Sequence, residues 1–160
     1  MDRAANGTRW IFVSYLALIV WVPIPLGSNR PWAWALMEFW VFALALWWLS
    51  GLIRGRRACP PVLRDAWPML ACSLAWLAYV WFQLLPLPIG WLEWLSPVAA
   101  RWHVAAAAPA AIASAPLTLD RYAGVESAFK STAYIAFFAL SLVLLGSRAR
   151  IRIATYVVAI

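Results

Sequence analysis

The sequence has little charge, one histidine and two cysteines, and each scarcity excludes a class of protein. Charged residues make up 12% of the 160 residues and hydrophobic residues 66%, whereas soluble domains carry about 25% charged residues. This composition excludes a soluble globular domain. One histidine cannot build a histidine-based metal cluster, and Cys59 and Cys72 fall in a predicted loop and an apolar run. The sequence therefore predicts no disulfide, no metal site and no cofactor.

The motifs of soluble enzymes are absent as well. The chain has no phosphate-binding glycine loop and no nucleophile elbow. Its net charge of +7 would suggest nucleic acid as the partner of a soluble protein, but the arginines cluster in short segments between apolar runs. This clustering is a signal of membrane topology, so membrane lipid is the expected partner and nucleic acid is not.

Long stretches without charge dominate the chain. A charged residue at the centre of a membrane-spanning helix costs about 2.5 to 3.5 kcal/mol, and a span needs about 17 to 25 residues. We therefore predict an all-α fold, a polytopic transmembrane bundle with four complete helices and the start of a fifth. The expected helices cover about residues 10–26, 32–53, 66–85, 128–147 and 151–160. Asp120 is a suitable cap ahead of the fourth helix.

The positions of the basic residues predict the orientation. With the N-terminus in the cytoplasm, nine of the thirteen Lys and Arg residues lie inside and four outside, as the positive-inside rule requires. Residues 86–126 then form an extracytoplasmic loop, with short interfacial helices expected around Ile89–Leu95 and Pro97–Ala108. A helix that stops inside the bilayer leaves carbonyls without partners. We therefore expect the natural protein to continue beyond Ile160, with this chain as one N-terminal membrane segment.

Four residues are candidates for substrate binding. Glu38 is the charged residue inside a predicted span, which marks either a functional carboxylate or a structural ion pair. Arg30, on the outer face, could bind a phosphate with two parallel hydrogen bonds, although interfacial anchoring is the commoner role of such arginines. Arg121 and Lys130 add positive charge to that face, which suits an anionic lipid-linked substrate, or they are solvated loop residues. No catalytic residue is identified.

Three segments resemble the bacterial O-antigen ligase and O-antigen polymerase family. They are residues 23–34 (PIPLGSNRPWAW), residues 83–88 (QLLPLP), and Leu119-Asp120 followed by Lys130-Ser131 and Ala133-Tyr134. The resemblance implies a glycosyltransferase of the bacterial inner membrane. Such an enzyme transfers an oligosaccharide from undecaprenyl diphosphate to lipid A-core, to a growing polymer or to protein, on the periplasmic side and without a metal.

In that family the catalytic arginine and histidine lie further along the chain, in a large periplasmic loop. No position here matches that motif, so the resemblance implies an inactive fragment that contributes scaffold and part of the lipid-carrier groove. Arg30 would then be the best candidate for contact with the diphosphate. The competing interpretations are a transporter or a non-catalytic membrane subunit, and a truncated gene product. Broken helices in inverted repeats would favour a transporter, and none is visible in the sequence.

Overall fold

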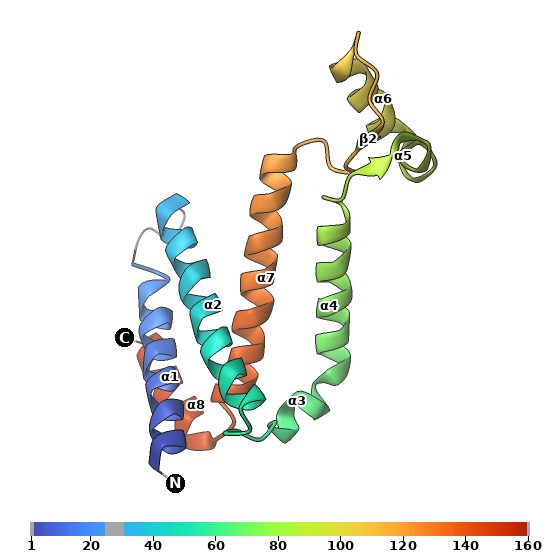
Figure 1. Ribbon diagram of the computed structural model, residues 1–160. Helices are drawn as coiled ribbons and strands as arrows, with labels where there is room; N and C mark the ends of the chain where they lie inside the picture. The colour runs from blue at the N-terminus through green and yellow to red at the C-terminus, as the bar shows by residue number, and fades with distance from the viewer. Residues whose placement is uncertain (1, 25–30, 160) are drawn as a thin grey trace. The chain divides into compact units, whose positions relative to one another are not determined.

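The computed structural model describes residues 2–24 and 31–159, which are mostly helical (Figure 1). The helices are α1 (Asp2–Trp21), α2 (Pro31–Ile53), α3 (Pro61–Asp65), α4 (Trp67–Phe82), α5 (Ile89–Leu95), α6 (Pro97–Ala107), α7 (Arg121–Leu144) and α8 (Arg148–Ala159). Strands β1 (Leu87–Pro88) and β2 (Ser114–Ala115) form one antiparallel pair. The chain divides into two compact units, Met1–Leu70 with Ala133–Ile160, and Ala71–Thr132.

Within residues 2–24 and 31–159, two helices, α2 and α7, are long and apolar enough to cross a bilayer. The apolar parts of α1 and α4 are shorter, Gly7–Trp21 and Trp67–Phe82. The 16 residues of α4 rise about 24 Å at 1.5 Å per residue, less than the roughly 30 Å of a hydrocarbon core. The prediction of a largely helical chain is thus confirmed, and two of its described helices are candidate membrane spans by length and composition.

Several helix ends differ from the predicted boundaries. Helix α1 begins at Asp2, well before residue 10, because helical hydrogen bonds can continue through polar residues outside the apolar stretch. It ends at Trp21, shortly before Pro23, because a proline disfavours helical geometry in the residue that precedes it. Helix α7 begins at Arg121 and ends at Leu144, earlier at both ends than expected.

The first unit has an apolar core between α1, α2 and the later part of α7. Its buried residues are Ile11, Phe12, Tyr15, Leu18, Met37, Val41, Leu44, Leu140 and Leu144. Two polar contacts connect these helices: the indole of Trp40 donates to Ser14 Oγ at 2.9 Å, and Tyr15 Oη lies 2.7 Å from Ser141 Oγ. Since the core joins residues far apart in sequence, it fixes how α1 and α2 pack against α7.

The second unit contains a small subdomain built on the β1–β2 pair. Its core is formed by Leu92, Ala99, Ala100 and Ala115 from α5, α6 and β2. Ser96 caps α6, since its Oγ accepts the amide of Ala99. The two short helices expected in this loop are therefore present, and the small alanine side chains allow them to pack closely.

Prolines and a cap determine where α4 ends and α7 begins. Helix α4 ends at Phe82, ahead of Pro86 and Pro88, which lack the amide hydrogens that a helix needs. At the start of α7, the carboxylate of Asp120 accepts the amide of Ala123 at 3.0 Å. The cap predicted at Asp120 is confirmed.

Candidate functional site

A polar groove lies between α4 and the first part of α7, within the second unit. Its volume is about 400 Å³. It is lined by Trp76, Val80, Gln83, Leu84, Thr118, Asp120, Ala123, Gly124, Ser127 and Ser131. Most of these residues are three or four positions apart along each helix, so they share one helix face. We call this feature the α4–α7 groove.

Gly124 allows α7 to lie close to the end of α4. A Cβ at this position would lie 2.8 Å from Cδ2 of Leu84 and 3.3 Å from Oγ1 of Thr118. The backbone amide of Thr118 donates to the carbonyl of Gln83 at 3.2 Å, which connects the segment before α7 to the end of α4. The close approach of α7 to the end of α4 at this groove therefore requires a residue without a side chain at position 124.

Hydrogen bonds hold Thr118 and Asp120 in place at the end of the groove. The Thr118 hydroxyl donates to the Asp120 carbonyl at 3.0 Å, and the His103 ring contacts the Thr118 carbonyl at 3.2 Å through Nε2. Because a carbonyl can only accept, Nε2 carries the proton. His103 therefore acts here as a positioning group for the segment before α7.

Near the end of α4, Trp81 fixes the contact of this helix with α7. Its indole N–H donates to Thr132 Oγ1 at 3.2 Å, and its ring lies edge-on to Phe129 with the ring centres 5.5 Å apart. Edge-to-face geometry is favourable for aromatic pairs. These contacts orient α4 and α7 so that Gln83 and Ser131 line the same groove.

The groove is lined by uncharged hydrogen-bonding groups and by one carboxylate, that of Asp120, which already accepts the amide of Ala123. Hydroxyls of Thr118, Ser127 and Ser131 and the amide of Gln83 line it beside the exposed ring of Trp76. Hydroxyls and amides both donate and accept, and an indole face packs against apolar faces of a ligand. Among the described residues, the lining includes no lysine or arginine. The groove thus suits an uncharged polyhydroxylated group better than a phosphate.

Three of the four residues predicted as binding residues from the sequence are described, and none of the three lines the groove. Arg30 lies outside the residues that the structure describes. Glu38 is buried in α2, in the first unit, with 7% of its surface exposed. Arg121 is exposed at the first position of α7, and the Lys130 ammonium forms an ion pair with Glu126 at 2.6 Å. The three described residues are not part of the groove lining.

Two of the three segments that carry the family resemblance do meet at the groove. Gln83 and Leu84 come from residues 83–88, and Asp120 and Ser131 from the segment that leads into α7. Sequence reasoning missed Trp76, Thr118 and Ser127 as lining residues. The spacing of Ser127 and Ser131, four positions apart, was the available signal for a polar helix face.

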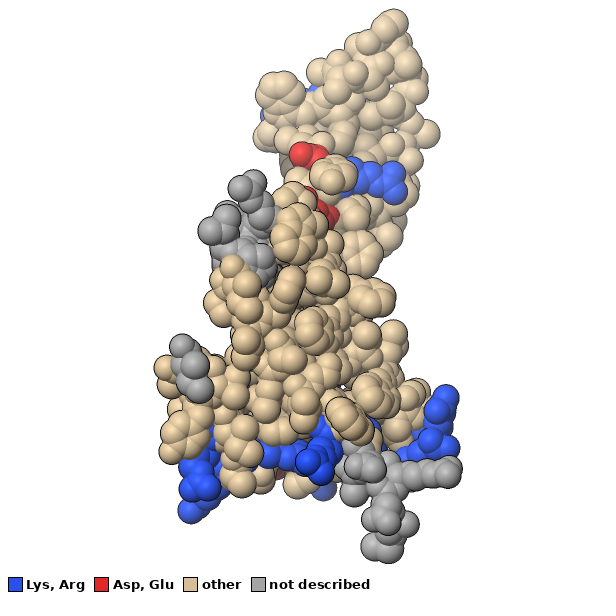
Figure 2. All heavy atoms as spheres, turned by 90° about the vertical axis from the view of Figure 1, so that its left-hand side faces the viewer, with Lys and Arg blue, Asp and Glu red and all other residues tan. Residues whose placement is uncertain are grey.

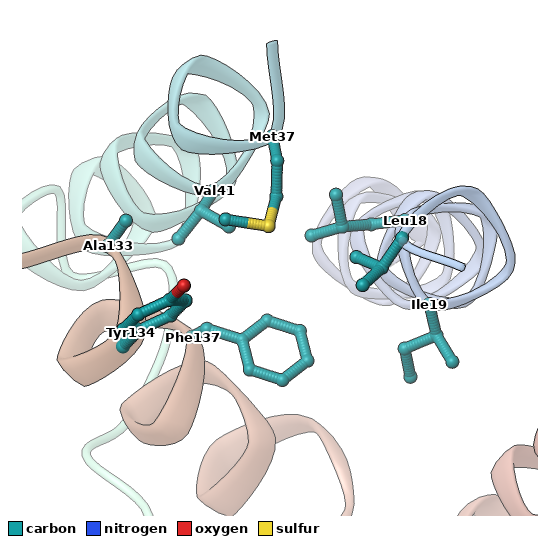
Figure 3. A pocket seen from close by; sticks show the side chains of 8 residues that line it. Leu18, Ile19, Met37, Val41, Ala133, Tyr134 and Phe137 are labelled. Atoms are coloured by element: carbon teal, nitrogen blue, oxygen red, sulfur yellow. The ribbon is translucent and has the colours of Figure 1, made fainter. Parts of the chain in front are cut away.

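An apolar cavity of about 230 Å³ lies in the first unit, between α1, α2 and α7. Figure 3 shows Leu18 and Ile19 of α1, Met37 and Val41 of α2, and Phe137 of α7 around this space. Its wall is almost entirely carbon and sulfur, apart from the hydroxyl of Tyr134. It can accept only apolar groups, because polar groups would lose their hydrogen bonds there.

The described residues contain no cluster of three His, Cys, Asp or Glu side chains that could hold a metal ion. Comparison with protein-family models, with curated proteins and with solved structures finds no match for the chain.

Proposed function

We propose that the chain is the membrane-embedded N-terminal part of a glycosyltransferase of the O-antigen ligase and polymerase type. It would lie in the bacterial inner membrane and act on undecaprenyl-diphosphate-linked glycan at the periplasmic face. The observation that carries the proposal is the convergence of residues 83–88 and 119–131 on the α4–α7 groove. These segments carry the family resemblance, and the groove has the chemistry to bind sugars.

The proposal includes four complete spans and the start of a fifth, with the N-terminus in the cytoplasm. The lengths and the apolar composition of α2 and α7 support two of these spans. Helix α4 has no buried residue and exposes large apolar side chains, among them Trp67, Met69 and Leu74. Monomeric soluble proteins rarely expose apolar patches of this kind, whereas lipid or another helix would cover them favourably.

In this proposal the α4–α7 groove binds the glycan of the donor, which contacts the hydroxyls and the indole that line it. Arg30 is our candidate for the diphosphate. Arg121 adds an exposed positive charge next to Asp120, whereas Lys130 is partly neutralised by Glu126. We assign Glu38 a structural role inside the helix bundle and no contact with the donor.

Deletion of the gene in its own bacterium tests the proposal. We expect lipid A-core or the other acceptor to lose its glycan, and the undecaprenyl-diphosphate-linked glycan to accumulate, as measured by gel electrophoresis and by mass spectrometry of extracted lipids. Unchanged glycan and unchanged carrier-linked pools in the deletion strain would show that the proposed function is wrong.

A matched pair of variants tests the role of the groove. Ser131→Leu places a branched apolar side chain in the groove and removes a hydroxyl, so we expect reduced glycan transfer by the full-length protein. Tyr122→Leu is the control, because Tyr122 lies on the same helix with 82% of its surface exposed and does not line the groove. Equal transfer by both variants at equal protein levels would exclude the groove from donor binding.

A further inference from the structure

A tight turn at the end of α2 directs Arg57 back toward the helix. The amide of Gly55 donates to the Leu52 carbonyl and the amide of Arg56 to the Gly51 carbonyl, both at 3.0 Å. This pair of bonds is a Schellman motif, which needs a left-handed residue at its centre. Gly55 supplies it with φ of 64°.

The returned Arg57 side chain lies against two glycines of different helices. A Cβ on Gly51 of α2 would lie 2.8 Å from Nε of Arg57, and a Cβ on Gly7 of α1 would lie 3.3 Å from its Nη2. Any larger residue at Gly51 would therefore push the guanidinium out. The two glycines form a seat for this side chain at the end of the α1–α2 pair.

The seated guanidinium still has hydrogen-bonding capacity. Its Nη1 is shielded from solvent and has no acceptor among the described residues. Burial lowers the pKa of Arg57, because the charged form loses hydration. The residue as a whole is only partly buried, so an anion can still approach it. A shielded guanidinium without an acceptor is unfavourable, and a bound anion would compensate for the lost hydration.

The first unit carries further arginines. The described ones are Arg9, Arg54, Arg56, Arg64, Arg148, Arg150 and Arg152. Figure 2 shows basic side chains gathered at one end of the face in view. Arg150 is itself fixed, since its Nη1 donates to the Leu144 carbonyl at 3.3 Å and its guanidinium lies 5.3 Å from the centre of the Phe12 ring. Within the described ranges, none of these arginines forms an ion pair with a carboxylate.

We propose that Arg57, seated between Gly7 and Gly51, is the centre of a binding site for the phosphate of an anionic phospholipid, with Arg54 and Arg56 of the same turn adding positive charge. The guanidinium forms two parallel hydrogen bonds with a phosphate. Basic residues at the end of apolar helices lie at the height of lipid headgroups, and clusters between helices on this side of a membrane bind anionic lipids. The site requires insertion in a membrane, but it does not depend on glycan transfer.

A lipid is the source of the phosphate that fits this position. The seat lies where α1 and α2, whose outer faces carry exposed apolar residues such as Val13 and Leu46, end in the arginine cluster. A phospholipid can place acyl chains along those faces while its headgroup reaches Arg57. Free inorganic phosphate could form only the hydrogen bonds with Arg57, because it has no acyl chains to lie along the apolar faces of α1 and α2.

Native mass spectrometry of the purified chain in detergent tests the proposal, with cardiolipin and phosphatidylcholine as probes. We expect the chain to retain cardiolipin in preference to phosphatidylcholine, and Arg57→Gln to reduce cardiolipin retention about tenfold, the effect of losing one charged hydrogen-bonded contact. Arg152→Gln is the control, because it removes an equal charge from an exposed position on α8, and its effect should be much smaller.

Gly51→Ala provides a second variant in which Arg57 is still present. Its Cβ displaces the flexible guanidinium while alanine favours the helix, so we expect cardiolipin retention to fall in a folded protein. Equal losses for Arg57→Gln and Arg152→Gln would overturn the proposal in favour of diffuse charge attraction. Full competition by inorganic phosphate would overturn the assignment to a lipid. Retention is measured without any transfer assay, so failure of the proposed glycosyltransferase function leaves this result interpretable.

Discussion

At the scale of single residues, Tyr15 shows how the first unit joins helices that are distant in sequence. Its side chain is buried, its ring stacks on Phe137 with the ring centres 5.2 Å apart, and its hydroxyl lies 2.7 Å from Ser141 Oγ. Ser141 donates its own hydrogen to the Phe137 carbonyl, so Tyr15 is the donor in the shared bond. A buried hydroxyl needs such a partner, because leaving it unpaired is costly.

Tyr15→Phe should therefore lower the free energy of unfolding by about 0.6 kcal/mol, the average for a hydrogen bond between membrane helices. The ring contact with Phe137 is retained, so the variant isolates the hydroxyl. Unfolding in mixed micelles of increasing SDS content measures the change. Ser141→Ala completes a double-mutant cycle, and strictly additive effects of the two substitutions would contradict the bond.

Gly124 offers a residue-scale test of how the groove is built. Gly124→Val would bring methyl groups into Leu84 and Thr118, and we expect destabilisation by about 1 to 3 kcal/mol from overpacking. Thermal unfolding in detergent measures it. Gly90→Val is the matched control, since a Cβ there has nothing within 4 Å. Similar melting temperatures for the two variants would show that α7 does not depend on close approach at Gly124.

At the scale of elements, local signals in the sequence predicted most of the helices. Ser96 before α6, Pro97 at its first position and Asp120 before α7 act within a few residues, so the starts of these helices could be predicted from the chain alone. The range 128–147 expected for this helix begins later than the Asp120 cap indicates, because apolar composition marks the membrane-spanning part of a helix and not its polar first turns. The groove was missed for a different reason: Gln83 and Ser131 come together only through the packing of α4 against α7.

The cap at Asp120 gives an element-scale prediction. Asp120→Ala should destabilise the first turn of α7 by about 0.5 to 2 kcal/mol, because the amide of Ala123 loses its acceptor. Hydrogen exchange of the amides in residues 121–124 should become faster, while that of residues 136–144 stays unchanged. Asp120→Asn retains an acceptor oxygen, so the amides of residues 121–124 should exchange in this variant as fast as in the wild type. Uniform acceleration along all of α7 would argue against a local cap.

At the scale of the whole molecule, the two cysteines report on topology. Cys59 lies exposed between α2 and α3, and Cys72 lies on the apolar helix α4. If the N-terminus is cytoplasmic, a membrane-impermeant maleimide should label neither cysteine in intact spheroplasts and should label Cys59 after permeabilisation. Cys72 should stay protected by lipid in both cases.

Ser114→Cys in a chain without the native cysteines serves as the positive control for the outer side, and it should react before permeabilisation. Labelling of Cys59 from outside would reverse the predicted orientation. Reaction of Cys72 in intact membranes would show that α4 is not embedded in lipid.

The β1–β2 pair has a consequence for how this protein can vary. It places Leu87 opposite Ala115 and Pro88 opposite Ser114, so the chain leaves and returns at nearly the same point. The 25 residues from 89 to 113 form an excursion from the main path of the chain, and they share a small core with Ala115 of β2. Relatives could lengthen, shorten or replace this excursion while α4 and α7 keep their register, which makes it the natural place for homologues to diverge in length.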